Sequence, residues 1–222
     1  MSADQSPSSR TSFAHHQPVR IAVLISGSGR SLANLLAVID DGKLDAGVVA
    51  VVSSVVGVRG LEIATEAGIP RTTITRRGFA DDAAYSEAVY AWLAPHRPDL
   101  IVLAGFLRKL DVPAAWEGRI LNIHPALAAA FPYASGRGFY GERVHAAVLA
   151  NNDERSGATI HVVDNGYDTG PVVAEIAVPV LPGDTAATLG ARVFAAECEL
   201  YPATIRNYVA AHPELFGRTD PM

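Results

Sequence analysis

The sequence has few cysteines, no long apolar run and no basic block, which are the features of disulfide-bonded, membrane-spanning and nucleic-acid-binding proteins. It contains one cysteine, Cys198, which excludes an internal disulfide or a multi-cysteine metal site and fits a reducing, cytoplasmic compartment. No apolar run approaches the roughly 20 residues that span a bilayer. The formal net charge is −5 and there is no basic block, so a nucleic-acid partner is not expected. We therefore expect a cytoplasmic protein that binds neither membrane nor nucleic acid.

The sequence does have the apolar content for one sizeable α/β domain. It contains 222 residues, of which 49% are hydrophobic, and this is enough to bury a substantial core. Residues 1–18 are rich in Ser, Ala, Gln and Pro and lack the apolar segment of a signal peptide, so we predict a disordered tail there. We assign 19–212 to a single domain and 213–222 to a C-terminal tail.

Apolar runs and helical patterns alternate along this domain. The runs at 20–25, 47–54 and 99–104 are nearly continuous, which is typical of parallel strands buried on both faces. Strands are predicted at 20–25, 47–54, 71–75, 99–104, 119–124, 156–163 and 172–180, and helices at 32–36, 61–67, 81–93, 112–116, 142–151 and 186–210. This alternation favours an α/β fold with an open, mostly parallel, Rossmann-like sheet and helices on both faces. Pro202 should kink or break the last helix.

A glycine-rich turn, 26–31 (SGSGRS), connects the first strand to the first helix. A strand, such a turn and a helix present backbone N–H groups and a helix N-terminus to an anion. Leu32 stands where a dinucleotide fingerprint needs its third glycine, and the Lys-Ser/Thr pair of a P-loop is absent. We therefore expect a small phosphate, such as a sugar phosphate, with Ser31 as a helix cap; a turn that binds nothing is the alternative.

Two polar side chains end the apolar strand at 119–124. Asn122 and His124 are two positions apart, so they share one face of the strand. Further along the chain, Asp164 and Asp168 lie in one turn and could supply a carboxylate. The alternative is turn chemistry and a buried core histidine. A metal site is disfavoured because three close ligands are not evident.

The residue types at this strand end suit a reaction without a protein nucleophile. Neither a serine nor a cysteine stands beside Asn122 and His124, so the simplest chemistry is attack by a substrate amine or water on a carbonyl. Asn122 can donate an N–H to the developing oxyanion. His124 can do the same when protonated, or relay a proton, while a nearby carboxylate raises its pKa and accepts the proton that the amine loses.

Four motifs together resemble one family. LNIHP at 121–125 and GATIHVVDNGYDTGP at 157–171 resemble the formyltransferase family that uses 10-formyltetrahydrofolate. ISGSGRSL at 25–32 and LAGFLRKL at 103–110 are similar to the branch of that family whose acceptor is 5′-phosphoribosylglycinamide. The resemblance covers about residues 20–210. It implies the formyltransferase fold and transfer of the formyl group from 10-formyltetrahydrofolate, the co-substrate, to the glycinamide amine in de novo purine biosynthesis.

The resemblance also implies roles for individual residues. It makes Asn122, His124 and Asp168 the catalytic residues, with the Asp-x-Gly-Pro pattern favouring Asp168 over Asp164. The remaining implied contacts are the substrate phosphate at Gly29, Arg30 and Ser31, the substrate at Glu197, and the folate at Leu107, Arg108, Lys109, Leu110, Asn122 and Asp164. The substrates are small molecules, no metal is implied, and a monomer and a homodimer both remain open.

Two positions depart from the family's pattern. The alanine-rich segment at 126–132 replaces a Ser-Leu-Leu-Pro sequence, although the glycine-rich segment after it, which we expect to form a lid-like loop, has family counterparts. Asp82 stands where some members have an arginine, which leaves the residues that hold the folate tail unassigned but does not affect the chemistry. Three alternatives remain open. The first is a sibling formyltransferase, although the extra domain or the phosphate loop expected of such enzymes does not match this sequence. The second is a hydrolase that uses water as acceptor, and the third is a binding module without activity.

Overall fold

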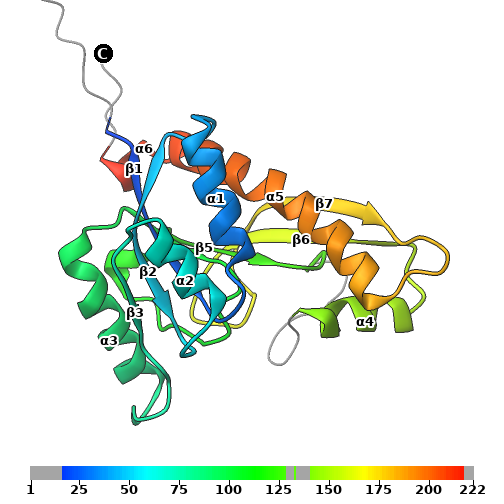
Figure 1. Cartoon of the computed structure of the whole chain (residues 1–222), viewed down its shortest axis with the longest axis horizontal. Helices are drawn as coiled ribbons and strands as arrows, with labels where there is room; N and C mark the ends of the chain where they lie inside the picture. The colour runs from blue at the N-terminus through cyan, green and yellow to red at the C-terminus, as the bar shows by residue number, and fades with distance from the viewer. Residues whose placement is uncertain (1–16, 129–132, 134–140, 218–222) are drawn as a thin grey trace, which may run out of the picture.

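The computed structural model describes residues 17–128, 133 and 141–217, and its strands form one seven-stranded sheet (Figure 1). The strands are β1 Val19–Ile25, β2 Ala46–Ser53, β3 Arg71–Thr73, β4 Leu100–Leu103, β5 Ile120–His124, β6 Arg155–Val162 and β7 Val172–Pro179. The helices are α1 Arg30–Asp40, α2 Arg59–Glu66, α3 Asp82–Leu93, α4 Glu142–Ala150, α5 Ala186–Ala211 and α6 Pro213–Phe216, with short 3₁₀ segments η1 Ala94–His96 and η2 Ala114–Trp116.

The strand order is β3-β2-β1-β4-β5-β6-β7. The strands from β3 to β5 pair in parallel, whereas β6 pairs antiparallel with both β5 and β7. The predicted open, mostly parallel sheet is therefore confirmed. The antiparallel β6 matters for the site because it places a second strand directly beside the polar end of β5. None of the described helices is long and apolar enough to cross a membrane.

Helices cover both faces of the sheet, as predicted. Alternate residues of β1 belong to different cores: Ile21 and Val23 pack with α1, α2, α4 and α5, whereas Ala22 and Leu24 pack with α3. Each of these four side chains is fully buried. Burial on both faces explains why the strand is a continuous apolar run without alternation.

Helix α5 runs through Pro202 without a break, so of the predicted kink or break the break does not occur. A proline lacks the N–H that would bond the carbonyl four residues earlier, which here belongs to Cys198. Asn34 of α1 supplies the missing donor, because its Nδ2 lies 2.8 Å from the Cys198 carbonyl oxygen. A contact between two helices therefore replaces the intrahelical hydrogen bond, and this contact was not evident from spacing within α5.

Helix α1 begins two residues earlier than a Ser31 cap requires, so that expectation is also wrong. Gly29 is the N-cap residue, with φ 72° in the left-handed region, and no side chain caps the helix. A Cβ at Gly29 would lie 2.4 Å from the Cα of Gly60 in α2, which no side chain can tolerate. The glycine therefore lets the two helices approach closely and leaves the Ser31 hydroxyl beside the backbone N–H groups of the first turn.

The C-terminal boundary also differs from the sequence-based assignment. Residues 213–216, which we assigned to a tail, form the short helix α6. Phe216 of this helix packs against the larger core and makes an edge-to-face contact with Tyr208 of α5. The ordered domain therefore extends a few residues beyond 212.

Candidate functional site

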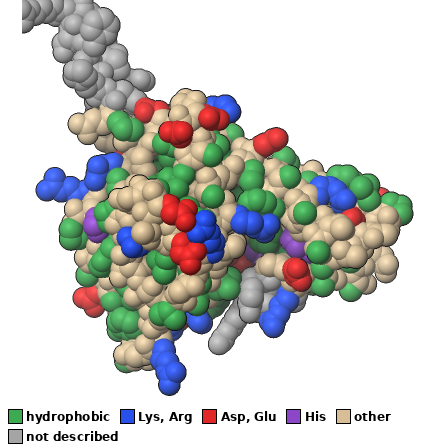
Figure 2. All heavy atoms as spheres, in the orientation of Figure 1, with side chains coloured by type: hydrophobic (Ala, Val, Ile, Leu, Met, Phe, Trp, Pro, Cys, Tyr) green, Lys and Arg blue, Asp and Glu red, His purple; other side chains and the backbone are tan. Residues whose placement is uncertain are grey.

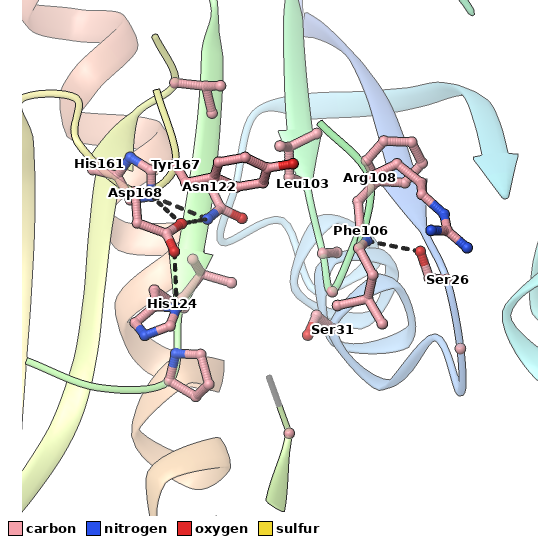
Figure 3. A pocket seen from close by; sticks show the side chains of 18 of the residues that line it. Ser26, Ser31, Leu103, Phe106, Arg108, Asn122, His124, His161, Tyr167 and Asp168 are labelled. Carbon is pink, nitrogen blue, oxygen red and sulfur yellow. Dashed lines mark hydrogen bonds and ion pairs between the residues drawn. The ribbon is translucent and has the colours of Figure 1, made fainter. Parts of the chain in front are cut away.

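The carboxyl ends of β1, β4 and β5 open onto a cavity of about 870 Å³. Figure 2 shows histidine side chains in a hollow of the surface beside α4, and Figure 3 shows part of the lining. Every site residue that the sequence predicted lines this cavity: Gly29, Arg30, Ser31, Leu107, Arg108, Lys109, Leu110, Asn122, His124, Asp164, Asp168 and Glu197. The fold therefore brings segments far apart in the sequence to one place, as ligand sites of open α/β sheets require.

Asn122, His124 and Asp168 converge at one end of the cavity (Figure 3). The Nδ2 of Asn122 donates to Asp168 Oδ1 at 3.3 Å. The Nδ1 of His124 lies 3.7 Å from Asp168 Oδ2, with the imidazole buried and the carboxylate only 17% exposed. The structure thus places an amide, an imidazole and a carboxylate around a common point with little access to water.

His161 joins this group and was not identified from the sequence. Its Nδ1 lies 3.1 Å from the Val162 carbonyl oxygen, which assigns the proton to Nδ1 because a carbonyl can only accept. The neutral Nε2 then accepts from Asn122 Nδ2 at 3.0 Å. His161 therefore fixes the rotation of the Asn122 amide and turns its nitrogen toward Asp168. Spacing placed His161 on one side of its strand, but only the antiparallel register, which pairs residues 122 and 161, brings it to Asn122.

The turn between β6 and β7 is held by side-chain bonds to its own backbone and to a neighbouring loop. Asp164 Oδ1 accepts from the Gly166 N–H at 2.9 Å and from the Thr169 hydroxyl at 2.8 Å. Asn165 Oδ1 accepts from the Val112 N–H at 2.7 Å, which ties the turn to the loop after β4. These bonds give Asp164 a clear structural role in addition to its place in the cavity wall.

The backbone of this turn points Asp168 at the cavity. Asp168 has φ 52°, in the left-handed region where non-glycine residues are uncommon. A Cβ at Gly170 would lie 1.7 Å from the Val162 carbonyl oxygen, so this position needs a glycine. The Asp-x-Gly pattern therefore has a local reason: the glycine allows the chain to return closely along β6 while the aspartate faces β5.

The other end of the cavity is formed by the turn after β1 and by α5. Arg30 lies with its guanidinium carbon 4.1 Å from the centre of the Phe194 ring. The Leu107 N–H donates to the Ser26 hydroxyl oxygen at 2.9 Å, which fixes the turn against the loop after β4 (Figure 3). Phe194 was not identified from the sequence, since its place in an apolar helix pattern indicated only core packing.

Glu197 faces the same end of the cavity from α5. Burial raises the pKa of its carboxyl to about 7, an effect that the positive charge of Arg30 partly opposes. One turn further along the helix, the hydroxyl of Tyr201 lies 2.9 Å from the Leu121 carbonyl oxygen and 3.1 Å from that of Leu103. Tyr201 therefore anchors α5 to β4 and β5 and sets the position of Glu197.

His145 of α4 is a further cavity residue that the sequence did not single out. It is buried, and its Nδ1 has no hydrogen-bond partner among the described residues. Burial lowers the pKa of the imidazole. Its ring occupies the space above Gly190 of α5, where a Cβ would lie 2.8 Å from Cδ2.

The loop after β4 forms the outer wall of the cavity. Leu107 is 45% exposed and Leu110 is buried, while Lys109 lies 3.4 Å from Asp111. Next to this loop, the Nε of Arg76 lies 2.6 Å from Asp82 Oδ1, and both side chains line the cavity. An arginine from the segment after β3 therefore lies beside Asp82 at the cavity wall.

The expected lid-like loop falls largely outside the described residues, because 129–132 and 134–140 are not among them. Within the described part of the chain, no group of three or more His, Cys, Asp or Glu side chains is placed to hold a metal ion.

Comparisons with known proteins identify the family of the chain. The sequence model described as formyl transferase matches residues 19–205. A phosphoribosylglycinamide formyltransferase from Mycobacterium tuberculosis is 40% identical over 212 residues, which is 92% of each chain. The trifunctional purine biosynthetic protein adenosine-3 of Drosophila melanogaster is 40% identical over 194 residues, but the chain spans only 14% of that protein.

Solved structures show the same fold. The phosphoribosylglycinamide formyltransferase of Brucella melitensis has a TM-score of 0.77 at 38% identity, with 87% of this chain and 96% of that chain covered. Glycinamide ribonucleotide transformylase 1 from Symbiobacterium toebii has a TM-score of 0.79 at 34% identity, with 88% and 90% covered. The resemblance that the motifs indicated is confirmed, and the chain belongs to the formyl transferase family of enzymes.

Proposed function

We propose that the protein transfers the formyl group of 10-formyltetrahydrofolate to the amine of 5′-phosphoribosylglycinamide, a step of de novo purine biosynthesis. The observation that carries the proposal is the meeting of Asn122, His124 and Asp168 in the same cavity as the turn that ends at Ser31. Such a cavity suits an acceptor with an amine at one end and a phosphate at the other. The whole-length relatives named as phosphoribosylglycinamide formyltransferases support the same assignment.

In this proposal the acceptor amine attacks the formyl carbon directly. One N–H of Asn122 is held by His161, whereas the other makes the 3.3 Å contact with Asp168 and is the one available to the developing oxyanion. Protonated His124 stabilises the same oxyanion and passes a proton to the leaving folate nitrogen. Asp168 stabilises that imidazolium and accepts the proton that the attacking amine loses, so it serves both partners.

The folate binds along the loop after β4 in this proposal. Leu107 and Leu110 present apolar surface, and the turn at Asp164 borders the same part of the cavity. Arg76 is the residue that we assign to the carboxylates of the folate tail. Its Nε is committed to Asp82, and one further nitrogen bonds the Phe79 carbonyl, which fixes the orientation of a guanidinium that retains donors for a carboxylate.

A direct assay tests the assignment. The purified protein is incubated with 10-formyltetrahydrofolate and 5′-phosphoribosylglycinamide, and tetrahydrofolate is followed. We expect product only when both substrates are present. Absence of tetrahydrofolate release with both substrates would contradict the proposal, and equal release without the amine would indicate hydrolysis.

Arg76→Ala should raise the KM for the folate several-fold and leave the KM for the acceptor unchanged.

A further inference from the structure

Arg30 is held in an unusual way for a cation at a ligand cavity. It is an exposed residue in the first turn of α1, and its guanidinium lies over the ring of Phe194. Among the described residues it makes no hydrogen bond and no close ion pair. Its charge acts on Glu197 electrostatically, without a hydrogen bond between the two side chains. The ring therefore orients the guanidinium without neutralising its charge and without using its N–H donors.

The position of the ring follows from α5. Phe194 and Glu197 are three residues apart and therefore lie on the same face of the helix. Four residues after Arg30, Asn34 bonds the Cys198 carbonyl of α5 at 2.8 Å. Helices α1 and α5 thus make two contacts, Arg30 with Phe194 and Asn34 with Cys198. On each helix, the two contacting residues are separated by one helical turn. This pair of contacts fixes the ring relative to the N-terminus of α1.

We propose that Phe194 is a positioning residue that holds Arg30 ready to bind the phosphate monoester of the acceptor, so that the pair selects phosphorylated acceptors. The inference rests on the proposed function and deepens it. A guanidinium stacked on an aromatic face keeps its edge free for two parallel hydrogen bonds to phosphate oxygens. The N–H groups of the first turn of α1 and the Ser31 hydroxyl lie beside it and complete an anion site.

Binding experiments test this independently of turnover. Isothermal titration calorimetry with ribose 5-phosphate, and with ribose as the unphosphorylated control, is carried out on the wild type, Phe194→Leu, Phe194→Tyr and Arg30→Met. We expect Phe194→Leu to weaken ribose 5-phosphate binding roughly fivefold, because a cation–π contact of ordinary strength is lost. Phe194→Tyr retains the ring and should retain the affinity.

A double variant separates a positioning role from a general structural one. If Phe194 acts through Arg30, Phe194→Leu should add no further loss in the Arg30→Met background. In steady-state assays, Phe194→Leu should raise the KM for the phosphorylated acceptor while kcat and the KM for the folate stay unchanged. Phe216→Leu, the same substitution in α6 away from the cavity, serves as the control for lost apolar contact.

The outcomes are distinct from those of the activity assay. Wild-type affinity in Phe194→Leu, additive losses in the double variant, or no difference between ribose 5-phosphate and ribose would each overturn the inference. A protein that binds ribose 5-phosphate as expected but does not transfer formyl groups would contradict the proposed function and leave the phosphate site supported.

Discussion

At the scale of single residues, Asn122 and His124 approach different oxygens of the Asp168 carboxylate. Asn122 Nδ2 donates to Oδ1, and His124 Nδ1 lies near Oδ2. His161 Nε2 lies 3.4 Å from Oδ1 but accepts from Asn122, so it acts on Asp168 through the orientation of that amide. Asn122 and His124 could be predicted from the sequence because their spacing on one strand is local. His161 could not, because it reaches the site through pairing with a strand that lies far along the chain.

Asp168→Asn tests the proposed proton acceptor. The amide keeps the size of the side chain but is not a base, so kcat should fall by about 10²–10⁴. Unfolding by denaturant should change far less than kcat, since asparagine keeps the size of the side chain and its amide oxygen can still accept from Asn122 Nδ2. Asp40→Asn, at an exposed position near the end of α1, is the matched control. A kcat close to that of the wild type would show that Asp168 is not the acceptor.

Glu197 gives a pH dependence of stability. Its folded-state pKa of about 7 lies above the ordinary value of 4.5, so the folded state holds the proton more tightly than the unfolded state. Its contribution to the free energy of unfolding is therefore fully present below the ordinary value and falls as the pH rises toward 7. Glu197→Gln stays neutral and should be more stable than the wild type at pH 8, by on the order of 2 kcal/mol.

Denaturant titrations at pH 5 and pH 8 measure this difference. The stability gain of Glu197→Gln should be larger at pH 8 than at pH 5. Glu199→Gln, on the exposed side of the same helix, should show equal effects at both values. The interpretation of Glu197 fails if the two variants behave alike.

At the scale of elements, α5 positions the end of the cavity that we propose to bind phosphate, through contacts with its neighbours. Both Phe194 and Cys198 contact α1, and Tyr201 contacts the ends of β4 and β5. The existence and approximate bounds of this helix were predictable from its capping residue and its pattern. Its continuity through Pro202 was not, because the compensating donor comes from another helix.

Asn34→Ala tests that compensation. The substitution leaves the Cys198 carbonyl without a donor, which should cost about 1–3 kcal/mol in the free energy of unfolding. Pro202→Ala restores an N–H four residues after Cys198, so in that background the cost of Asn34→Ala should drop by about half or more. Chemical denaturation of the two single variants and the double variant gives the coupling, with the exposed Asn207→Ala as control. Additive effects would exclude the proposed exchange of donors.

At the scale of the whole molecule, the sheet brings together the separate parts of the site. The turn after β1, the loop after β4 and the end of β5 meet because parallel strands end at one edge, which the sequence pattern already indicated. Figure 1 shows β6 and β7 extending the sheet beyond β5, with α5 packed against both strands. The turn between β6 and β7 carries Asp168. Arg76 shows the limit of prediction, since only the packing of the segment after β3 against α3 places this arginine beside Asp82.

The central claim is that the acceptor amine attacks the formyl carbon directly at the end of β5. The most direct measurement uses 10-formyltetrahydrofolate labelled with carbon-13 in the formyl group, with 5′-phosphoribosylglycinamide as acceptor, and follows the label by NMR. We predict that the label moves to the formamide of the product at the rate at which tetrahydrofolate appears, and that Asp168→Asn slows both equally. Label recovered as formate, or label that does not leave the folate, would contradict the account.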